Sequence, residues 1–504
     1  MAHRLTLYFT SDTHGYVYPT DFISPGILRQ GLLRMRFKKD GNTLVIDGGD
    51  TLQGSPLTYY CHTMGLPAPC ARVMNDLGYD YVTLGNHDFN YGYDTLADYL
   101  NALQAKCLCA NVHDLAGRLP ILPYALRTLE NGLRVGLIGV VTNWINVWEQ
   151  PENLTRVKVD GTLQAAREAV AALRNQADVL IGIYHGGFER DLETGKLLSD
   201  TDENIGWRLC EELPFDILLT GHQHIPMANL EIHGTHVAQA PANAKGYVRV
   251  TVDEQGTITS ALCEADQPPM MKPWHETLFN DLNRWLDTPI GRLSRPLLPE
   301  SKLTMALHGS PIADFINRVQ LDVSGADVSC TALGNEISGF QTQVTVRDVV
   351  ASYPFANTLV VLNVTGKTLR LALEQCASYF LVHENGSLGI GDFFTKPKEA
   401  HYNYDYFSGI EYAFDLRRPV GARVVKLTRQ SKPVLDDDSM TLVMNNYRAT
   451  GAGGFDCYKP CPRVREIQTE VSELLLNYLQ THSPVEIPAM APYTVTTPDE
   501  KGFS

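Results

Sequence analysis

Residues 5–14 read LTLYFTSDTH, an apolar run that leads directly into an aspartate and a histidine. Four more apolar runs in the first 225 residues end in the same way. The five polar strings are Asp12-Thr13-His14, Gly48-Gly49-Asp50, Gly85-Asn86-His87-Asp88, His185-Gly186-Gly187 and Gly221-His222-Gln223-His224. The apolar runs before them predict buried strands over residues 5–10, 44–46, 81–84, 179–184 and 217–220.

Amphipathic stretches alternate with these strands, and residues 69–77, 93–105 and 163–176 are predicted helices. This alternation predicts an α/β fold with much parallel pairing. In such sheets, ligands bind in the crevice outside the carboxyl ends of the strands. All five polar strings fall at such ends, so we expect their side chains to converge.

The polar strings supply carboxylate, amide and imidazole ligands, a mixture that suits borderline divalent cations. Asp12 and His14 are placed to face one ion, and His222 and His224 to face two neighbouring ions. Asp50, which follows two flexible glycines, is placed to bridge both. A metal pair about 3.5–4 Å apart can generate hydroxide and orient a phosphate. The sequence therefore predicts a hydrolase with two divalent metal ions, chosen from Mn²⁺, Zn²⁺, Fe²⁺ and Co²⁺.

The composition is that of a globular protein, with 44% hydrophobic and 20% charged residues. A length of 504 residues favours two domains. The net charge of −15 argues against binding of polymeric nucleic acid. It does not exclude a small phosphorylated substrate, because bound metals reverse the field locally. No run of 18 apolar residues is present, so no membrane contact is expected.

The N-terminal residues lead into the first strand without the pattern of a signal peptide. We therefore expect a cytoplasmic protein, or a secreted or periplasmic one if this sequence is a mature form. The ten cysteines are scattered along the chain, and free thiols are the expected state.

A Pro-rich segment and an amphipathic helix over 274–287 divide the chain. The predicted domains are 1–265 and 301–504, with a linker and connecting helix, which we expect to act as a hinge, over 266–300. In the second domain we expect helices over 305–321, 367–379 and 464–481, and strands over 327–333, 358–364 and 441–444. The tail from 483 to 504 has four prolines and is expected to be extended or mobile.

The five strings resemble the motifs of the calcineurin-like metallophosphoesterases. The chain as a whole resembles the bacterial 5′-nucleotidase and 2′,3′-cyclic-nucleotide 2′-phosphodiesterase family. The resemblance implies an N-terminal four-layer α/β/β/α metallophosphoesterase sandwich and a second, smaller α/β substrate-binding domain. It also implies a small-molecule nucleotide substrate, whose phosphoester is hydrolysed by metal-bound hydroxide.

Site residues follow from the resemblance position by position. Asp12, His14, Asp50 and His224 are expected to hold one metal, and Asp50, Asn86, His185 and His222 the other. His87 is expected to stand beside the phosphate and to stabilise charge or protonate the leaving oxygen. The carboxylate of Asp88 is expected to pair with His87 and fix its tautomer.

Two stretches of the second domain resemble the nucleoside-binding loops of the family, Tyr353-Pro354-Phe355-Ala356-Asn357-Thr358 and Asn445-Asn446-Tyr447-Arg448-Ala449-Thr450-Gly451. Phe355 and Tyr447 are expected to sandwich the base, with Tyr353 as an alternative to Phe355. Stacking contributes roughly 1–3 kcal/mol per base. Asn445 and Asn446 are expected either to bind base or ribose or to cap the turn.

One departure bears on the substrate. The 5′-nucleotidase branch usually carries Gly-Gly-x-Arg where this chain has Gly334-Asn335-Glu336-Ile337. The missing arginine favours 2′,3′-cyclic nucleotides and 3′-nucleotides, and a 5′-nucleotidase or nucleotide-sugar hydrolase is the alternative. A binding protein with a degenerate site is a third interpretation, and it would require losses among the ligands that the sequence does not show.

Overall fold

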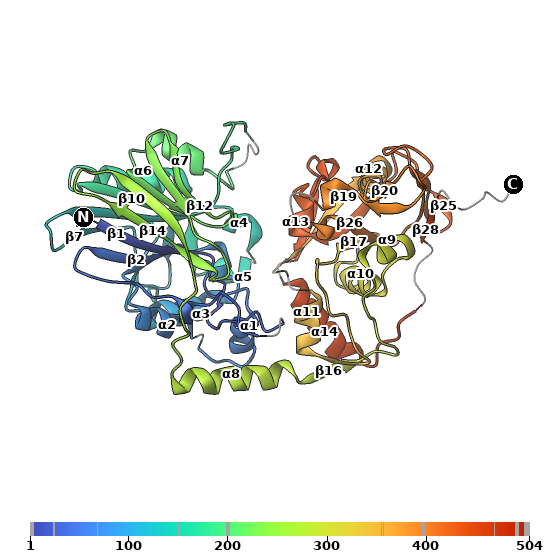
Figure 1. Cartoon of the computed structure of the whole chain (residues 1–504), viewed down its shortest axis with the longest axis horizontal. Helices are drawn as coiled ribbons and strands as arrows, with labels where there is room; N and C mark the ends of the chain where they lie inside the picture. Colours follow the sequence, from blue (N-terminus) through green and yellow to red (C-terminus); the bar gives the residue numbers. More distant parts are fainter. Residues whose placement is uncertain are drawn as a thin grey trace. The chain divides into compact units, whose positions relative to one another are not determined.

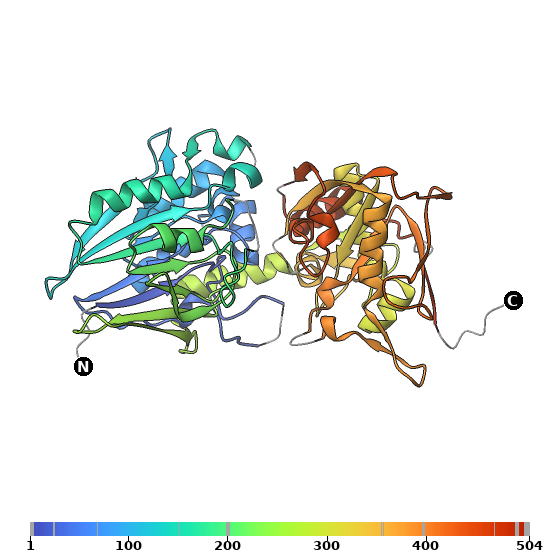
Figure 2. The same ribbon diagram turned by 90° about the horizontal axis from the view of Figure 1, so that it is seen from above.

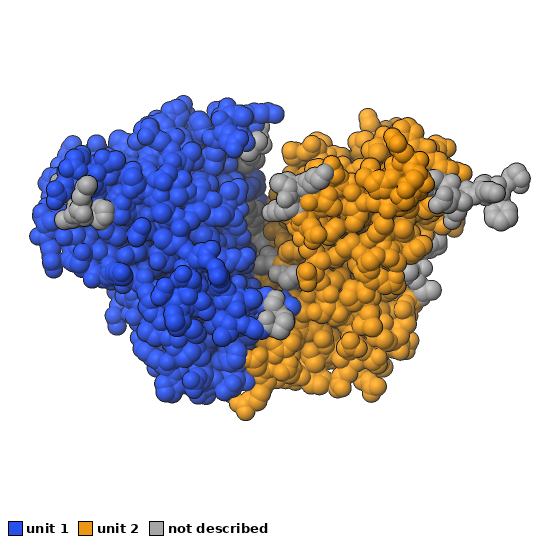
Figure 3. All heavy atoms as spheres, viewed as in Figure 1, with its two compact units in different colours: residues 1–282 blue, residues 283–504 orange. Residues whose placement is uncertain are grey.

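The computed structural model describes residues 5–23, 26–67, 69–149, 151–197, 202–353, 355, 357–395, 399–467, 469–488 and 493–497. The chain divides into two compact units, Met1–Leu282 and Asn283–Ser504, which Figure 3 shows in different colours. The division falls inside helix α8 (Pro273–Leu286). No helix in the described part of the chain combines the length and apolar character needed to cross a membrane.

Two sheets form the centre of the first unit. The larger has the order β15 (Ile258–Glu264), β14 (Gly246–Val252), β1 (Leu5–Thr10), β2 (Thr43–Asp47), β3 (Tyr81–Val82), β4 (Lys106–Leu108) and β6 (Ile121–Leu122). The smaller has the order β12 (Met227–Ile232), β13 (Thr235–Gln239), β11 (Ile217–Thr220), β10 (Val179–His185), β8 (Arg134–Val141) and β7 (Tyr124–Thr128). A separate ribbon pairs β5 (Val112–Asp114) with β9 (Val157–Val159).

The two sheets bury one apolar core between them. Leu7 and Phe9 of β1 and Ile46 of β2 meet Leu137 of β8 and Leu219 of β11, and all five are fully buried. Each such side chain contributes roughly 1.5–3 kcal/mol by leaving water. These strands are buried on both faces, which explains why their sequences are continuous apolar runs.

Helices cover both outer faces of the first unit, as Figures 1 and 2 show. The helices of the first unit are α1 (Pro56–Thr63), α2 (Cys70–Leu77), α3 (Gly92–Ala102), α4 (Ile145–Trp148), α5 (Pro151–Leu154), α6 (Thr162–Leu173) and α7 (Gly206–Glu212). Helix α6 buries Ala166, Ala169, Val170 and Leu173, a helical spacing that forms one apolar stripe. The predicted four-layer α/β/β/α sandwich is confirmed.

Parallel pairing brings the polar strings to one edge of each sheet. Strand β1 is parallel to β2, and β2 to β3. Strand β10 is parallel to β11 in the other sheet. The loops after β1, β2 and β3 therefore lie together, and so do the loops after β10 and β11.

The second unit is a smaller α/β body. Its main sheet has the order β22 (Asp405–Ser408), β17 (Val328–Ala332), β26 (Ser439–Asn445), β19 (Leu359–Thr365) and β27 (Arg463–Ile467). Another sheet joins β25 (Lys432–Pro433), β24 (Val424–Arg429), β23 (Glu411–Asp415) and β28 (Tyr493–Thr496). Two ribbons pair β16 (Pro289–Arg292) with β18 (Gln343–Thr345) and β20 (Phe380–Val382) with β21 (Leu388–Ile390). The helices are α9 (Lys302–His308), α10 (Pro311–Ser324), α11 (Val346–Ser352), α12 (Gly366–Ala377), α13 (Asn446–Ala449) and α14 (Val471–His482).

The single helix predicted over 305–321 is wrong, because two helices, α9 and α10, occupy this stretch. Gly309, whose φ is 86°, ends the first helix, and the Ser310 side chain accepts a hydrogen bond from the N–H of Ala313. Pro311 follows as the first residue of α10, where its missing N–H costs nothing. The sequence Gly-Ser-Pro therefore ends helix α9 and begins helix α10.

The helix predicted over 464–481 begins too early. Its first residues form strand β27, which pairs antiparallel with β19, and the helix α14 begins only at Val471. The pairing partner lies about a hundred residues earlier in the chain, so local periodicity did not reveal it.

All ten cysteines are free, as expected.

The described part of the C-terminal tail contains a strand, which agrees with the extended alternative of the prediction. Strand β28 pairs in parallel with β23, with Tyr493 opposite Tyr412. The Tyr493 ring lies 4.8 Å from the Tyr412 ring, and its hydroxyl bonds the Tyr404 hydroxyl and the Ala306 carbonyl. This tyrosine therefore fastens the tail to the second unit.

We predict that Tyr493→Ala destabilises the protein by roughly 1–3 kcal/mol, because it removes a partly buried ring and two hydrogen bonds. Denaturant unfolding measures the loss. Thr494→Ala is the matched control, since this exposed side chain on the same strand is expected to contribute within about 0.5 kcal/mol. Equal stability of the two variants would show that the tail is not fastened by the ring.

Candidate metal centre

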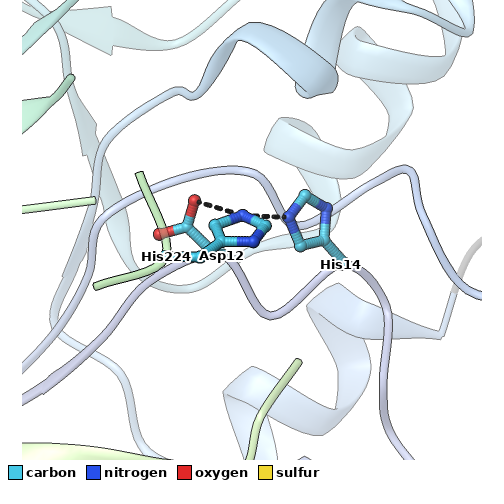
Figure 4. Close-up of side chains that lie close together, drawn as sticks. All are labelled: Asp12, His14 and His224. Carbon is cyan, nitrogen blue, oxygen red and sulfur yellow. Dashed lines mark hydrogen bonds and ion pairs between the residues drawn. The ribbon is translucent and has the colours of Figure 1, made fainter. Parts of the chain in front are cut away.

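Asp12, His14 and His224 form one group of metal-ligand type (Figure 4). The Nε2 atoms of His14 and His224 are 3.1 Å apart, and His224 Nε2 is 3.3 Å from Asp12 Oδ1. The Nδ1 of His14 lies 2.8 Å from the Gln53 carbonyl. Because a carbonyl only accepts, Nδ1 carries the proton and Nε2 presents its lone pair to the group.

Asp50, His185 and His222 form a second group. The His185 Nε2 lies 3.0 Å from Asp50 Oδ2, while its Nδ1 lies 2.7 Å from the Gly48 carbonyl. The His222 Nδ1 is 2.9 Å from Asn86 Oδ1, so the predicted ligand Asn86 lies beside this group. The structure thus brings together all seven residues predicted to bind metal, in two neighbouring sets.

Both groups have the properties of cation sites. Within each, the ligand atoms lie within 4.8 Å of one another. Asp12 Oδ2 is buried and makes no hydrogen bond within the described part of the chain. A buried carboxylate oxygen without a partner is costly unless a cation satisfies it. Asp12, Asp50 and His185 form the buried base, whereas the His224 side chain is 45% exposed at the rim.

The polar strings turn sharply as they leave the strands. Asp12, His14, Asp50, His222 and His224 all have φ between 48° and 72°, in the left-handed region that disfavours residues with a Cβ. Such backbone costs of order 1–3 kcal/mol per residue and gathers at functional sites. These turns bring the aspartate and histidine side chains of the polar strings together in the two groups.

The turns are tied to one another by hydrogen bonds. The N–H of Asp12 donates to the Gly49 carbonyl and that of His14 to the Asp50 carbonyl, each at 2.8 Å. The N–H of His222 donates to Asp12 Oδ1 at 2.8 Å, which links the two sheets. Gly85 makes this packing possible, because a Cβ there would stand 2.1 Å from Asp50 Oδ1.

Burial and charge shift the pKa values of His14 and His185 in opposite directions. Burial, and then the charge of His224, lower the pKa of His14 to about 4. Burial also acts to lower the pKa of His185, but the charge and hydrogen bonding of Asp50 outweigh it and raise the pKa to about 10. In the metal-free protein at neutral pH, His14 is therefore neutral and His185 is charged.

The predicted pairing of Asp88 with His87 is wrong. The buried Asp88 carboxylate accepts hydrogen bonds of 2.8–3.0 Å from four backbone N–H groups, those of Asp50, Thr51, Leu52 and Gly85. Burial, and then the charge of Asp50, raise its pKa. Asp88 thus shapes the Asp50 turn. The Nδ1 of His87 instead lies 2.8 Å from Asn90 Oδ1, a partner that no local signal in the sequence identified.

The predicted substrate residues lie in the second unit. Tyr447 is 43% exposed and Phe355 is partly exposed, whereas Tyr353 is 2% exposed. The Phe355 ring lies near those of Tyr353 and Tyr402, at 5.9 and 6.3 Å. The burial of Tyr353 favours Phe355 as the stacking residue. Pro354 and Ala356 of the same stretch lie outside the described residues.

Contacts of the neighbouring Asn445 and Arg448 side chains stabilise the loop that carries Tyr447. The Asn445 side chain caps α13 by accepting from the N–H of Arg448 at 2.7 Å, so it acts as the turn cap, while Asn446 is exposed. Sequence reasoning missed a buried ion pair here, Arg448 Nε with Asp405 Oδ2 at 2.8 Å. Its only signal was the position of Arg448 directly after Tyr447. This pair makes the loop a firm support for an exposed ring.

Comparison with known proteins agrees with this arrangement. Residues 5–226 match the calcineurin-like phosphoesterase family, and residues 289–460 match the 5′-nucleotidase C-terminal domain. A Staphylococcus aureus crystal structure of a candidate 5′-nucleotidase is 34% identical, with a TM-score of 0.77, and the match covers 98% of this chain and 100% of that one.

Two curated relatives are more distant. The chain is 24% identical to the 2′,3′-cyclic-nucleotide 2′-phosphodiesterase/3′-nucleotidase of Haemophilus influenzae, over 89% of this chain and 80% of the relative. It is also 24% identical to the trifunctional nucleotide phosphoesterase protein YfkN of Bacillus subtilis, over 94% of this chain but 38% of that longer protein. The chain belongs to the 5′-nucleotidase family, with a calcineurin-like phosphoesterase domain followed by a 5′-nucleotidase C-terminal domain.

Proposed function

We propose that the protein is a two-metal phosphoesterase that hydrolyses 2′,3′-cyclic nucleotides and 3′-nucleotides. The observation that carries the proposal is the pair of neighbouring ligand groups, Asp12-His14-His224 and Asp50-His185-His222. Asn86 joins the second group through its side-chain oxygen, and Asp50, a member of the second group, would serve both ions.

The ions, when bound, would supply Lewis acidity and an activated water for attack on phosphorus. The protein fixes the ligands for this task. Carbonyl groups of Gln53 and Gly48 hold the Nδ1 protons of His14 and His185, so that both rings direct Nε2 inward. His87, whose ring lies 5.4 Å from that of His14, would hold a proton for the departing oxygen.

The nucleoside would be recognised in the second unit by Phe355 and Tyr447, because every base offers a face for stacking. The loop after β17 supports the choice of substrate. Its Glu336 is exposed, and Lys302 and Asn335 bond backbone groups there. Ile337 occupies the place of the missing arginine, and the exposed carboxylate of Glu336 directly before it disfavours a further anionic group of the substrate.

A 5′-nucleotidase is the second candidate. The Staphylococcus aureus protein, at 34% identity, carries that name, whereas the relative named for cyclic nucleotides is 24% identical. Nucleotide-sugar hydrolysis belongs to the same alternative.

A substrate panel tests the proposal. We expect turnover of 2′,3′-cyclic AMP and 3′-AMP, with little of 5′-AMP or a nucleotide sugar, and loss of turnover after chelation that added Mn²⁺ reverses. Phosphate and nucleoside release are measured. His222→Ala is expected to abolish turnover, while His113→Ala, at an exposed histidine, leaves it unchanged. Preference for 5′-AMP would favour the second candidate, and metal-independent turnover would contradict both.

Tyr447→Ala is expected to raise KM for 2′,3′-cyclic AMP by about 10-fold, because one stacking contact of roughly 1–3 kcal/mol is lost. The KM for bis(4-nitrophenyl) phosphate, tested as a substrate without a nucleoside, should change little. Tyr124→Ala, at a ring of similar exposure in the first unit, is the control. Equal losses on both substrates would refute the stacking role.

Metal binding is expected to release protons, because His185 is charged in the metal-free protein and must be neutral to act as a ligand. Below a pKa of about 10, affinity for Zn²⁺ should therefore rise with pH, by about tenfold per pH unit for each proton released. Calorimetric titration in buffers of different ionisation enthalpy counts the protons.

Two variants distinguish the contributions of His185 and His14 to this proton release. His185→Asn should abolish the release of that proton, whereas His14→Asn should weaken binding but keep the release, since His14 is already neutral. Binding of Zn²⁺ without proton uptake by the buffer would contradict the protonation states inferred from the structure.

A further inference from the structure

His87 is held by a short chain of polar side chains that ends in a buried carboxylate. We propose that Glu149, acting through Asn90, positions His87 by setting which of its ring nitrogens carries the proton. Both are positioning residues, and their effect on turnover rests on the proposed function of His87 as proton donor to the leaving oxygen.

The chain is continuous in hydrogen-bond distance. His87 Nδ1 lies 2.8 Å from Asn90 Oδ1, and Asn90 Nδ2 lies 2.7 Å from Glu149 Oε2. The other carboxylate oxygen, Glu149 Oε1, accepts from Asn153 Nδ2 at 2.9 Å, and the same Nδ2 also reaches the Asn90 carbonyl at 3.2 Å. Asn153 therefore holds both Glu149 and the backbone of Asn90.

The carboxylate fixes the direction of every bond in the chain. A carboxylate only accepts, so the Asn90 amide must turn its NH₂ group to Glu149. Its oxygen then faces His87, and an amide oxygen only accepts as well. The proton of the neutral imidazole must therefore sit on Nδ1, which leaves Nε2 to take up a second proton from water and to pass that proton to the leaving oxygen.

The supporting groups come from a separate part of the fold. Asn90 follows the short helix that contains His87, whereas Glu149 caps the end of α4 and Asn153 lies on α5. Glu149 is 7% exposed, so its contacts are shielded from water. A carboxylate is costly to bury unless it is satisfied, and here donors from two asparagines satisfy it.

The arrangement places the neutral amide of Asn90 beside His87, and the negative charge of Glu149 lies on the far side of that amide. It fixes the tautomer and the ring orientation without placing an anion against the imidazole. The ring is thereby held toward the ligand groups, with His14 at 5.4 Å and the backbone N–H of His87 bonded to Asp50 Oδ1 at 2.7 Å.

The decisive variants exchange the two side chains. Glu149→Gln alone leaves two NH₂ donors facing each other. Asn90→Asp alone leaves two carboxylates facing each other. The double variant Asn90→Asp/Glu149→Gln restores every hydrogen bond, because Asp accepts from both neighbours and Gln donates to it while still accepting from Asn153. The two single variants and the double variant therefore form a double-mutant cycle, in which the double variant is expected to recover the function that each single variant loses.

The first readout is kcat on two aryl phosphodiesters, with the enzyme loaded with Mn²⁺. Each single variant is expected to lower kcat on diphenyl phosphate by about 10–100-fold and on bis(4-nitrophenyl) phosphate much less, since nitrophenolate leaves without a proton. KM should change little, and the double variant should recover most of kcat. Equal losses on both esters, or no recovery in the double variant, would overturn the proposal.

The second readout does not need activity. Nitrogen-15 NMR of histidine-labelled, Zn²⁺-loaded protein, with His87→Gln to assign the signal, should show His87 protonated at Nδ1 in the wild type and the double variant. A wild-type ring protonated at Nε2 and not at Nδ1 would overturn the proposal. Failure of the nucleotide panel alone would refute only the proposed substrate, because neither readout here uses a nucleotide.

Discussion

Five of the seven side chains assigned to the metal centre project from residues with positive φ, and all five carry a Cβ. Backbone of this kind persists only where the surroundings hold it in place. Here the surroundings are the ends of the parallel strands in two mixed sheets, whose loops bond to one another through Gly49, Asp50 and Asp12. The turns force aspartate and histidine side chains into a buried space, where Asp12 Oδ2 has no partner among the described residues. A cation is the group that would satisfy this arrangement.

Much of the rest of the first unit serves that constraint. The core between the sheets fixes their separation, and thereby the distance between the loops after β1, β2 and β3 and those after β10 and β11. Gly85 lets the Asp50 carboxylate approach, and Asp88 gathers four N–H groups around the Asp50 turn. The charge on Asp50 in turn sets the protonation of His185.

Local patterns were sufficient for the five strands that end in polar strings and for the convergence of those strings, whereas the sandwich and the two sets of candidate metal ligands followed from the family resemblance. An apolar run ending in Asp, Asn or His predicts a strand with a ligand at its carboxyl end, whatever lies elsewhere. The partner of His87 was beyond such reasoning. Asp88 is its neighbour in sequence but faces four backbone N–H groups, and the partner Asn90 is held by Glu149, about sixty residues later. The break at Gly309-Ser310-Pro311 had a local signal, whereas β27 and β28 became strands through partners far away in the chain.

Crystals of the protein grown with Mn²⁺, with anomalous diffraction recorded at the manganese edge, would test most directly whether the strained turns build a two-metal centre. The structure predicts two anomalous peaks about 3.5–4 Å apart, one beside Asp12, His14 and His224 and the other beside Asn86, His185 and His222, with Asp50 contacting both. A single peak, or peaks away from Asp50, would contradict the assignment.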